Sequence, residues 1–208
     1  MSEAKIRLSQ KEMEMVINAE WILTKNAILK KANHLLENLL AKQQECVKNY
    51  TIKLPAVVLQ SSPKISKGEN YKGLPYVVLD YPKNFSASTI LAIRTIFWWG
   101  NFFSVTLHLS GNYKKEAAKR LIASYGVLKE RGYYCCVNDE QWEHHFERDN
   151  YIRLTDLSKN DFIELITEKP FIKLSSKISL SCWDDAEEML LIYFKQLIAL
   201  LADQPPRR

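Results

Sequence analysis

Residues 71–111 read YKGLPYVVLDYPKNFSASTILAIRTIFWWGNFFSVTLHLSG and hold the clearest strand pattern of the chain. Apolar and polar residues alternate through the last part of this stretch, with Phe103, Val105, Leu107 and Leu109 in one set and Ser104, Thr106, His108 and Ser110 in the other. A period of two predicts a half-buried strand whose polar set lies on the opposite face from its apolar set. Gly111 is expected to end this strand. Residues 112–131, which begin with an Asn suited to an N-cap, predict the helix that follows.

Two strands are expected before the alternating segment. Thr51–Gln60 has β character, and Pro55 near its start suits an edge strand. Leu74–Tyr81 predicts the second strand, which Pro82 is expected to end. Between them, Ser61–Gly73 is rich in Ser, Pro, Gly and Asn, and this composition predicts a mobile loop.

The remaining sheet segments follow from local pattern. Ser86–Thr95 predicts a short helix, after which Ile96–Ser110 is expected to be strand with a bend or bulge at its Gly-Asn pair. Tyr133–Val137 predicts a short strand and Phe171–Cys182 a longer one. Residues 138–146, NDEQWEHHF, have no clear period, so the sequence assigns them no structure.

A long helical segment is expected at the amino terminus. Ser9 and Glu12 have the spacing of a capping box, so a helix is predicted to begin at Gln10, and no Gly or Pro interrupts the chain up to Lys48. A single helix of that length would extend roughly 57 Å, which is long for a compact domain. The sequence therefore favours a break near Thr24.

Two more helices are expected towards the carboxyl terminus. Asp156–Thr167 predicts a short helix, and residues 184–202 predict a final helix whose first turn carries negative charge, as the helix dipole favours. Helices at both ends with strands grouped between them predict an α+β fold, in which helices pack on a mainly antiparallel or mixed central sheet. We expect one domain, made of a helical segment 1–50, a sheet-forming region 51–182, a C-terminal helix 183–203 and a tail 204–208.

Composition bounds the class of protein. The chain has 208 residues and a net charge of +5, and most of the excess lies in residues 51–111, which hold six basic and two acidic residues. This small net positive charge permits an anionic partner without requiring one. The amino terminus lacks the apolar run of a signal peptide, and the most apolar windows are too short to span a bilayer. We therefore expect a cytoplasmic protein without membrane insertion.

Two segments carry a resemblance to known sequences. Residues 72–82, KGLPYVVLDYP, followed by residues 97–111, FWWGNFFSVTLHLSG, resemble a group of uncharacterised bacterial proteins. The similarity extends from about Lys67 to Gly132. It implies a small cytosolic domain and assigns no activity to any residue.

An enzyme site is one hypothesis for the polar set of the alternating strand. His108 would act as a general base, with Thr106, Ser104 or Ser110 as hydroxyl partners on the same strand face. Such a set also needs an acid to orient the histidine, and the sequence places none nearby. The alternative is a solvated polar sheet surface.

A zinc site is a second hypothesis, since Cys135, Cys136, His144 and His145 are ligand types that zinc prefers. Adjacent residues rarely reach one ion together, and structural sites separate paired ligands by two to four residues. Cys135 and Cys136 are expected on opposite faces of a strand. We therefore predict no metal and no cofactor, and a fold that forms without them.

Binding residues are the third group. Trp98 and Trp99 form an aromatic cluster with the phenylalanines that follow, which suits either the core or a binding surface. The segment 61–73 is basic, and its Lys64, Lys67, Tyr71 and Lys72, together with Arg94, form a candidate site for an anionic small molecule or nucleic acid. It lacks the glycine pattern of a phosphate-binding loop.

The sequence thus leaves three hypotheses for function. The first is a non-enzymatic binding or assembly module, the second a small enzyme around His108, and the third a domain that contacts nucleic acid through the segment 61–73. A homodimer is also predicted, because Met189–Ala202 and the Trp98-Trp99 pair hold more apolar surface than one packed face needs. The amino-terminal helices are the alternative cover for those surfaces.

Overall fold

A twisted antiparallel sheet forms the centre of the protein. The computed structural model describes residues 6–50 and 54–202, and this part of the chain contains one seven-stranded sheet in the order β1-β2-β3-β4-β7-β5-β6. The strands are β1 (Lys64–Tyr71), β2 (Leu74–Phe85), β3 (Ile90–Trp98), β4 (Phe102–Ser110), β5 (Tyr134–Cys136), β6 (Tyr151–Arg153) and β7 (Phe171–Ser179). All neighbouring pairs are antiparallel, because the strands are joined by hairpins or by connections that return over the sheet.

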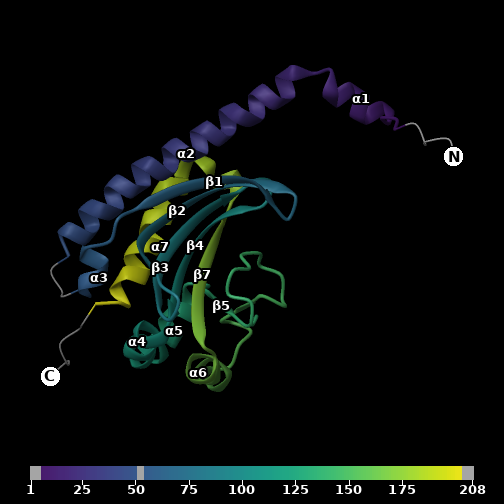
Figure 1. Ribbon diagram of the computed structural model, residues 1–208. Helices are drawn as coiled ribbons and strands as arrows, with labels where there is room; N and C mark the ends of the chain where they lie inside the picture. Colours follow the sequence, from purple (N-terminus) through teal and green to yellow (C-terminus); the bar gives the residue numbers. More distant parts are fainter. Residues whose placement is uncertain (1–5, 51–53, 203–208) are drawn as a thin grey trace.

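Helices cover one face of this sheet, so the predicted α+β fold is confirmed. The helices of the described residues are α1 (Gln10–Val16), which does not contact the sheet, α2 (Ala19–Lys48), α3 (Ala56–Leu59), α4 (Gly111–Ala123), α5 (Tyr125–Glu130), α6 (Lys159–Glu168), the 3-10 helix Leu180–Asp185 and α7 (Ala186–Ala199). Figure 1 shows α2 and α7 on one side of the sheet and the connection between β5 and β6 on the other. None of the helices in the described ranges is long and apolar enough to cross a membrane. The predicted tail 204–208 lies outside the described residues.

The alternating segment forms the centre of the sheet, as β4 between β3 and β7. Phe103, Val105 and Leu107 are fully buried against the helices, as the alternation predicts. The opposite face is buried too, since Thr106 is 4% exposed and His108 5% exposed. The expectation of a half-buried strand is therefore wrong, and β4 is covered on both faces.

Three local predictions failed where the tertiary structure overrides short-range pattern. Residues 90–95, expected in a helix, belong to the buried strand β3, because a continuous apolar run such as ILAI is compatible with either structure. The predicted strand Thr51–Gln60 instead contains the helix α3, while residues 51–53 lie outside the described residues. The segment 61–73, expected to be a loop, contains β1, an edge strand held by its backbone pairing with β2.

Pro82 does not end the second strand. β2 continues to Phe85, and the pairing with β3 shifts register between Asp80 and Lys83. A proline removes one backbone donor from the ladder, and a register irregularity accommodates that loss.

The amino-terminal helices are divided at a different place from the one predicted. Ser9 and Glu12 form the expected capping box, so the start of α1 at Gln10 is confirmed. The break comes after Val16, where Asn18 caps α2, and α2 then runs unbroken through Thr24 for 30 residues. Its second half packs on the body of the protein, and its first half, with α1, projects beyond the sheet (Figure 1).

The apolar helix α7 finds its cover within the chain. Leu190, Phe194 and Leu197 of α7 are completely buried, and they share one core with Leu36 and Leu39 of α2. The alternative in which the amino-terminal helices supply this cover is therefore the observed arrangement. These α7 side chains therefore do not need a second copy to cover them.

Candidate functional site

The site lies on the sheet face opposite the helices, beneath the connection of residues 137–150, which we call the covering loop. A row of directly paired residues crosses four strands of this face: Asp80 faces Arg94, Arg94 faces Thr106, and Thr106 faces Ser175. A second row pairs His108 with Lys173. Residues directly opposite one another in an antiparallel sheet project to the same side, so the register gathers these polar groups on one surface. We call it the loop-covered face.

The first row contains a buried ion pair. Arg94 donates from Nε to Asp80 Oδ1 at 2.7 Å and from Nη2 to Oδ2 at 3.0 Å, while Asp80 is only 4% exposed. Such two-pronged pairing fixes the guanidinium in its plane. Arg94 also lies over the ring of Phe85 at 5.5 Å and that of Trp142 at 5.9 Å, measured to the ring centroids. The arginine is thus held by one carboxylate and by aromatic rings.

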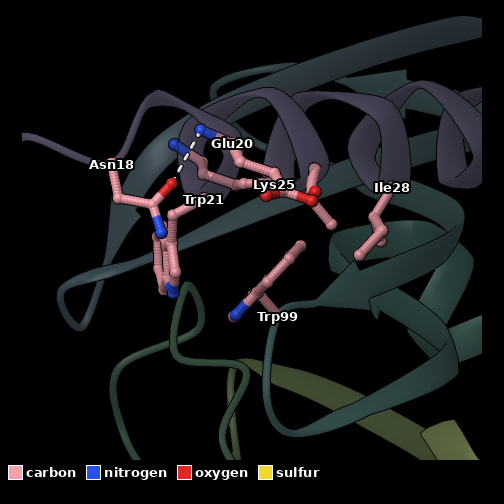
Figure 2. Close-up of a pocket in the computed structure, with 7 residues that line it drawn as sticks. Asn18, Glu20, Trp21, Lys25, Ile28 and Trp99 are labelled. Carbon is pink, nitrogen blue, oxygen red and sulfur yellow. Dashed lines mark hydrogen bonds between the residues drawn. The ribbon is translucent and has the colours of Figure 1, made fainter. Parts of the chain in front are cut away.

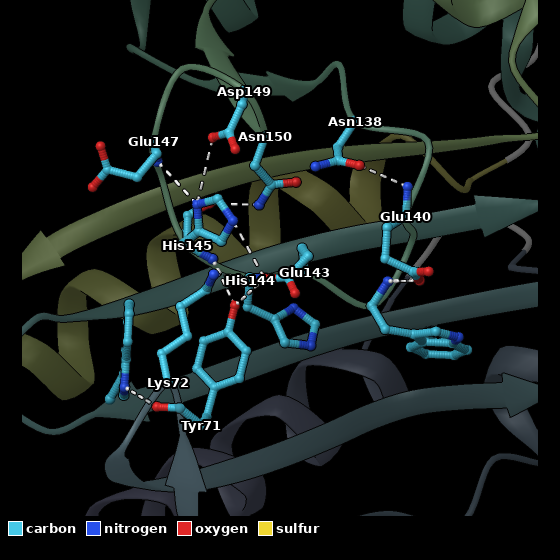
Figure 3. A network of polar contacts seen from close by, with 12 residues as sticks. Tyr71, Lys72, Asn138, Glu140, Glu143, His144, His145, Glu147, Asp149 and Asn150 are labelled. Atoms are coloured by element: carbon cyan, nitrogen blue, oxygen red, sulfur yellow. Dashed lines mark hydrogen bonds and ion pairs between the residues drawn. The ribbon is translucent and has the colours of Figure 1, made fainter.

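Tyr71, at the end of β1, fastens the covering loop to the sheet. Its hydroxyl accepts from the backbone N–H of His144 at 2.7 Å and of His145 at 3.1 Å, and donates to Glu143 Oε2 at 2.9 Å (Figure 3). Burial raises the pKa of the Tyr71 phenol to about 12, so it keeps the proton that Glu143 accepts. Nε2 of His145 also lies 3.3 Å from the same carboxylate. One phenol therefore organises three consecutive residues of the loop.

Lys173 holds the loop from the centre of the sheet. It lies on β7, is 1% exposed and donates from Nζ to the backbone oxygen of Glu143 at 2.6 Å. Its ammonium also lies 5.2 Å from the ring centroid of Tyr151. Burial lowers the pKa of Lys173, because an ammonium loses hydration inside the protein. The lysine accordingly serves as a buried support for the loop backbone.

Two neutral histidines lie next to these cations. Burial, together with the charges of Lys173 and Arg94, lowers the pKa of His108 to about 3. Burial and the Arg94 charge also lower the pKa of His144 well below its usual value. Arg94 Nη1 lies 3.1 Å from His144 Nε2, and a guanidinium can only donate, so Nε2 accepts and the ring proton sits on Nδ1. That nitrogen and His108 Nε2 are buried without a hydrogen-bond partner among the described residues.

A pocket of about 250 Å³ opens between the first three strands and the covering loop. It is lined by Ser66, Tyr71, Tyr76, Val78, Arg94, Ile96, Trp142 and His144. Aromatic rings and a guanidinium therefore border one small cavity, with two aliphatic side chains from β2 and β3 among them. This arrangement can hold a small flat molecule and contact an acceptor group on it.

The structure brings most of the sequence-predicted site residues together. Those on the loop-covered face or at its edge are Tyr71, Arg94, Trp98, Ser104, Thr106 and His108. Trp98 packs against Tyr71 and donates from its indole to the Tyr71 backbone oxygen at 3.2 Å. Trp99 projects to the other face, where its ring meets Phe97. Each tryptophan of the pair thus has its own neighbours.

The basic residues of 61–73 do not join Arg94 in one surface. Lys64 and Lys67 are exposed on the edge strand β1, and Lys72 lies 3.5 Å from Glu143. Arg94 is committed to the buried Asp80. A continuous basic face from this segment to Arg94, which nucleic-acid binding would use, is therefore absent among the described residues.

The hydroxyls near His108 do not form a nucleophile and base pair with it. Thr106 Oγ1 shares a hydrogen bond of 2.7 Å with Ser175 Oγ, and Ser175 also donates to the Val105 backbone. The His108 ring instead meets Trp142 and Phe171 edge to face.

The cysteine and histidine set is also divided. Cys135 belongs to the core on the helix side, and Cys136 lies on the loop-covered face, as expected for neighbours on a strand. The described residues contain no group of three or more side chains placed to hold a metal ion.

Sequence reasoning missed Asp80, Lys173 and the covering loop itself. A lone Asp in the apolar run YVVLDY and a lone Lys in a strand were the available signals, because buried charges need partners. Comparisons with family models, with curated proteins and with solved structures gave no match. Function is therefore inferred from the geometry of the site.

Proposed function

We propose that this protein is a non-enzymatic binding module, and that its ligand is a small planar anion held in the pocket beneath the covering loop. The observation that carries the proposal is the position of Arg94 in a cavity of about 250 Å³ bordered by Tyr71, Tyr76 and Trp142. A pocket with few polar groups among aromatic walls is the usual form of a small-molecule site.

The chemistry of the lining selects the ligand class. Arg94 directs Nε and Nη2 to Asp80 and donates from Nη1 to the neutral His144, while its side chain lines the pocket. Aromatic side chains favour flat ligands, and the aliphatic side chains of Val78 and Ile96 favour an apolar ring edge. An aromatic carboxylate combines a flat ring with a planar acceptor and matches these groups.

A binding role is also supported by what surrounds His108. Its hydroxyl neighbour Thr106 is engaged with Ser175, and its Nε2 faces no described partner. A general base needs its proton donor within about 3 Å. The arrangement suits a rigid floor for the covering loop better than acid–base chemistry.

Benzoate serves as a probe of the proposed site. We expect millimolar benzoate to shift the methyl resonances of Val78 and Ile96, which line the pocket, and to leave methyls elsewhere in the protein unchanged. Trp142→Ala should weaken this binding at least tenfold, since it removes one aromatic wall.

Trp21→Ala is the matched control for that variant. Trp21 and Trp142 are the same residue type and have similar exposure, 48% and 45%, but only Trp142 lines the pocket. The proposal fails if benzoate shifts neither methyl, or if both variants bind it equally well.

A further inference from the structure

The amino-terminal arm, residues 6–31, meets the packed body only towards its end, where Ile28 and Leu29 are partly buried against the core. It consists of α1 and the first part of α2, and none of its side chains is buried. Figure 1 shows the arm extending past the sheet. Helices shorter than about 12 to 15 residues are marginal in water without packing. The seven residues of α1 therefore lack the support that the single chain gives its other helices.

The arm carries a concentrated apolar surface. It holds nine of the fourteen exposed large hydrophobic side chains of the described residues: Ile6, Leu8, Met13, Met15, Val16, Ile17, Trp21, Ile22 and Leu23. Val16 is 67% exposed and Ile17 74%. Monomeric proteins rarely expose apolar residues in such a group, and a group of this kind marks an interaction surface.

A groove lies where the arm meets the body. It has a volume of about 320 Å³ and is lined by Asn18, Glu20, Trp21, Thr24, Lys25, Ile28 and Trp99 (Figure 2). Lys25 holds the arm at this point through an ion pair of 2.5 Å with Glu69 of β1. The two tryptophan rings border the groove from opposite sides, one on the arm and one on the turn after β3. Tryptophans in this setting are frequent centres of protein interfaces.

Charge along the arm indicates which partner fits. Residues 10–20 contain Glu12, Glu14 and Glu20 with one lysine, whereas residues 21–31 contain three lysines and no acidic residue. A two-fold axis brings the same two surfaces together twice. When two arms lie antiparallel, the acidic half of each meets the basic half of the other. A second copy of this chain therefore supplies both an apolar surface and the complementary charge.

We propose that the arm pairs antiparallel with the arm of a second copy, about a two-fold axis near Glu20. In this register Val16 and Ile17 of each copy lie over the groove between Trp21 and Trp99 of the other. The acidic Glu14 of one copy comes to about one helical turn from Lys30 of the other, because residue 14 then lies opposite residue 26. The proposal is independent of the ligand pocket, which lies on the opposite face of the sheet from α2.

Sedimentation velocity tests the dimer. The wild-type protein at tens of micromolar should sediment as a dimer, and Val16→Asp combined with Ile17→Asp should sediment as a monomer. Both residues are exposed in the single chain, so these changes leave its core intact. Leu59→Asp, a change at an exposed leucine outside the arm, should leave the dimer unchanged. A monomeric wild type, or a dimer that survives the double substitution, would overturn the proposal.

A charge exchange tests the antiparallel register. Glu14→Lys should raise the dissociation constant about fivefold, since the pair occurs twice and each exposed pair contributes a fraction of a kcal/mol. Adding Lys30→Glu should restore the wild-type dissociation constant. In the double variant the lysine at position 14 of each copy again lies near an opposite charge, the glutamate at position 30 of the other copy. Restoration supports the two-fold pairing, and an additive loss refutes it. Vesicles that contain anionic lipid provide a further test. If the protein binds them as a monomer through its amino-terminal arm, the proposed dimer is also refuted.

Discussion

The loop-covered face and the amino-terminal arm depart from the usual distribution of residues in opposite ways. The first buries Asp80, Lys173 and His108, and the second exposes Val16 and Ile17. On the loop-covered face, the chain itself supplies partners for the buried charges through the ion pair to Arg94 and the backbone of the covering loop. Val16 and Ile17 of the arm have no such cover within the described residues of the chain. The buried polar groups are explained by contacts within the chain, and the exposed apolar surface of the arm is the basis of the proposed dimer.

Removing Arg94 should cause the largest loss of stability among the variants proposed for these two regions. Arg94→Leu leaves the carboxylate of Asp80 buried without its partner, and we expect a loss of about 3 to 5 kcal/mol in the free energy of unfolding. Urea denaturation measures it. Lys42→Ala, which breaks the exposed pair with Glu187, is the control and should cost under about 1 kcal/mol. Equal losses would contradict a buried, structurally required pair.

Acid should destabilise the loop-covered face through its histidines. The pKa of His108 is about 3 in the folded protein and 6.5 when unperturbed, so the unfolded state binds more protons between these values. The stability contribution is therefore complete above pH 6.5 and is lost as pH falls, at about 1.4 kcal/mol per pH unit. His144 acts in the same direction. Thermal or urea unfolding between pH 7 and pH 5 should show this slope, and His108→Gln should reduce it.

Removing one hydroxyl should loosen the covering loop. Tyr71→Phe leaves the N–H groups of His144 and His145 and the Glu143 carboxylate without this partner, which costs about 1 to 3 kcal/mol. Hydrogen exchange at residues 143–146 should become faster, while the β4 amides should remain among the slowest in the protein. Unchanged exchange in the loop would show that Tyr71 is not its main attachment.

Substitutions on the arm should give the smallest effect on folding. Val16→Asp changes an exposed side chain, so in the monomer we expect a change within about 0.5 kcal/mol. Denaturation at low micromolar concentration measures this, and raising the concentration should stabilise only the wild-type protein, since a dimer adds stability by mass action. A large loss at low concentration would mean that Val16 packs within its own chain.

Local sequence was sufficient for features that depend on neighbouring residues. The capping box of Ser9 and Glu12 was predictable because its bonds join residues three apart. The apolar face of β4 was predictable from the alternation of Phe103, Val105 and Leu107, because a strand turns each side chain to the opposite face from the one before. The α+β class followed from the order of such segments along the chain.

Tertiary structure decided the features that join distant parts of the chain. The polar segment Lys64–Tyr71 is a strand because β2 lies beside it, and the Asp80–Arg94 pair depends on the register of β2 and β3. The polar side of β4 is buried because residues 137–150 lie over it, and their attachment at Tyr71 spans 73 residues between Tyr71 and His144. No local pattern encodes such contacts, since the energy of a hydrogen bond or an ion pair depends on distance in space and not on separation along the chain.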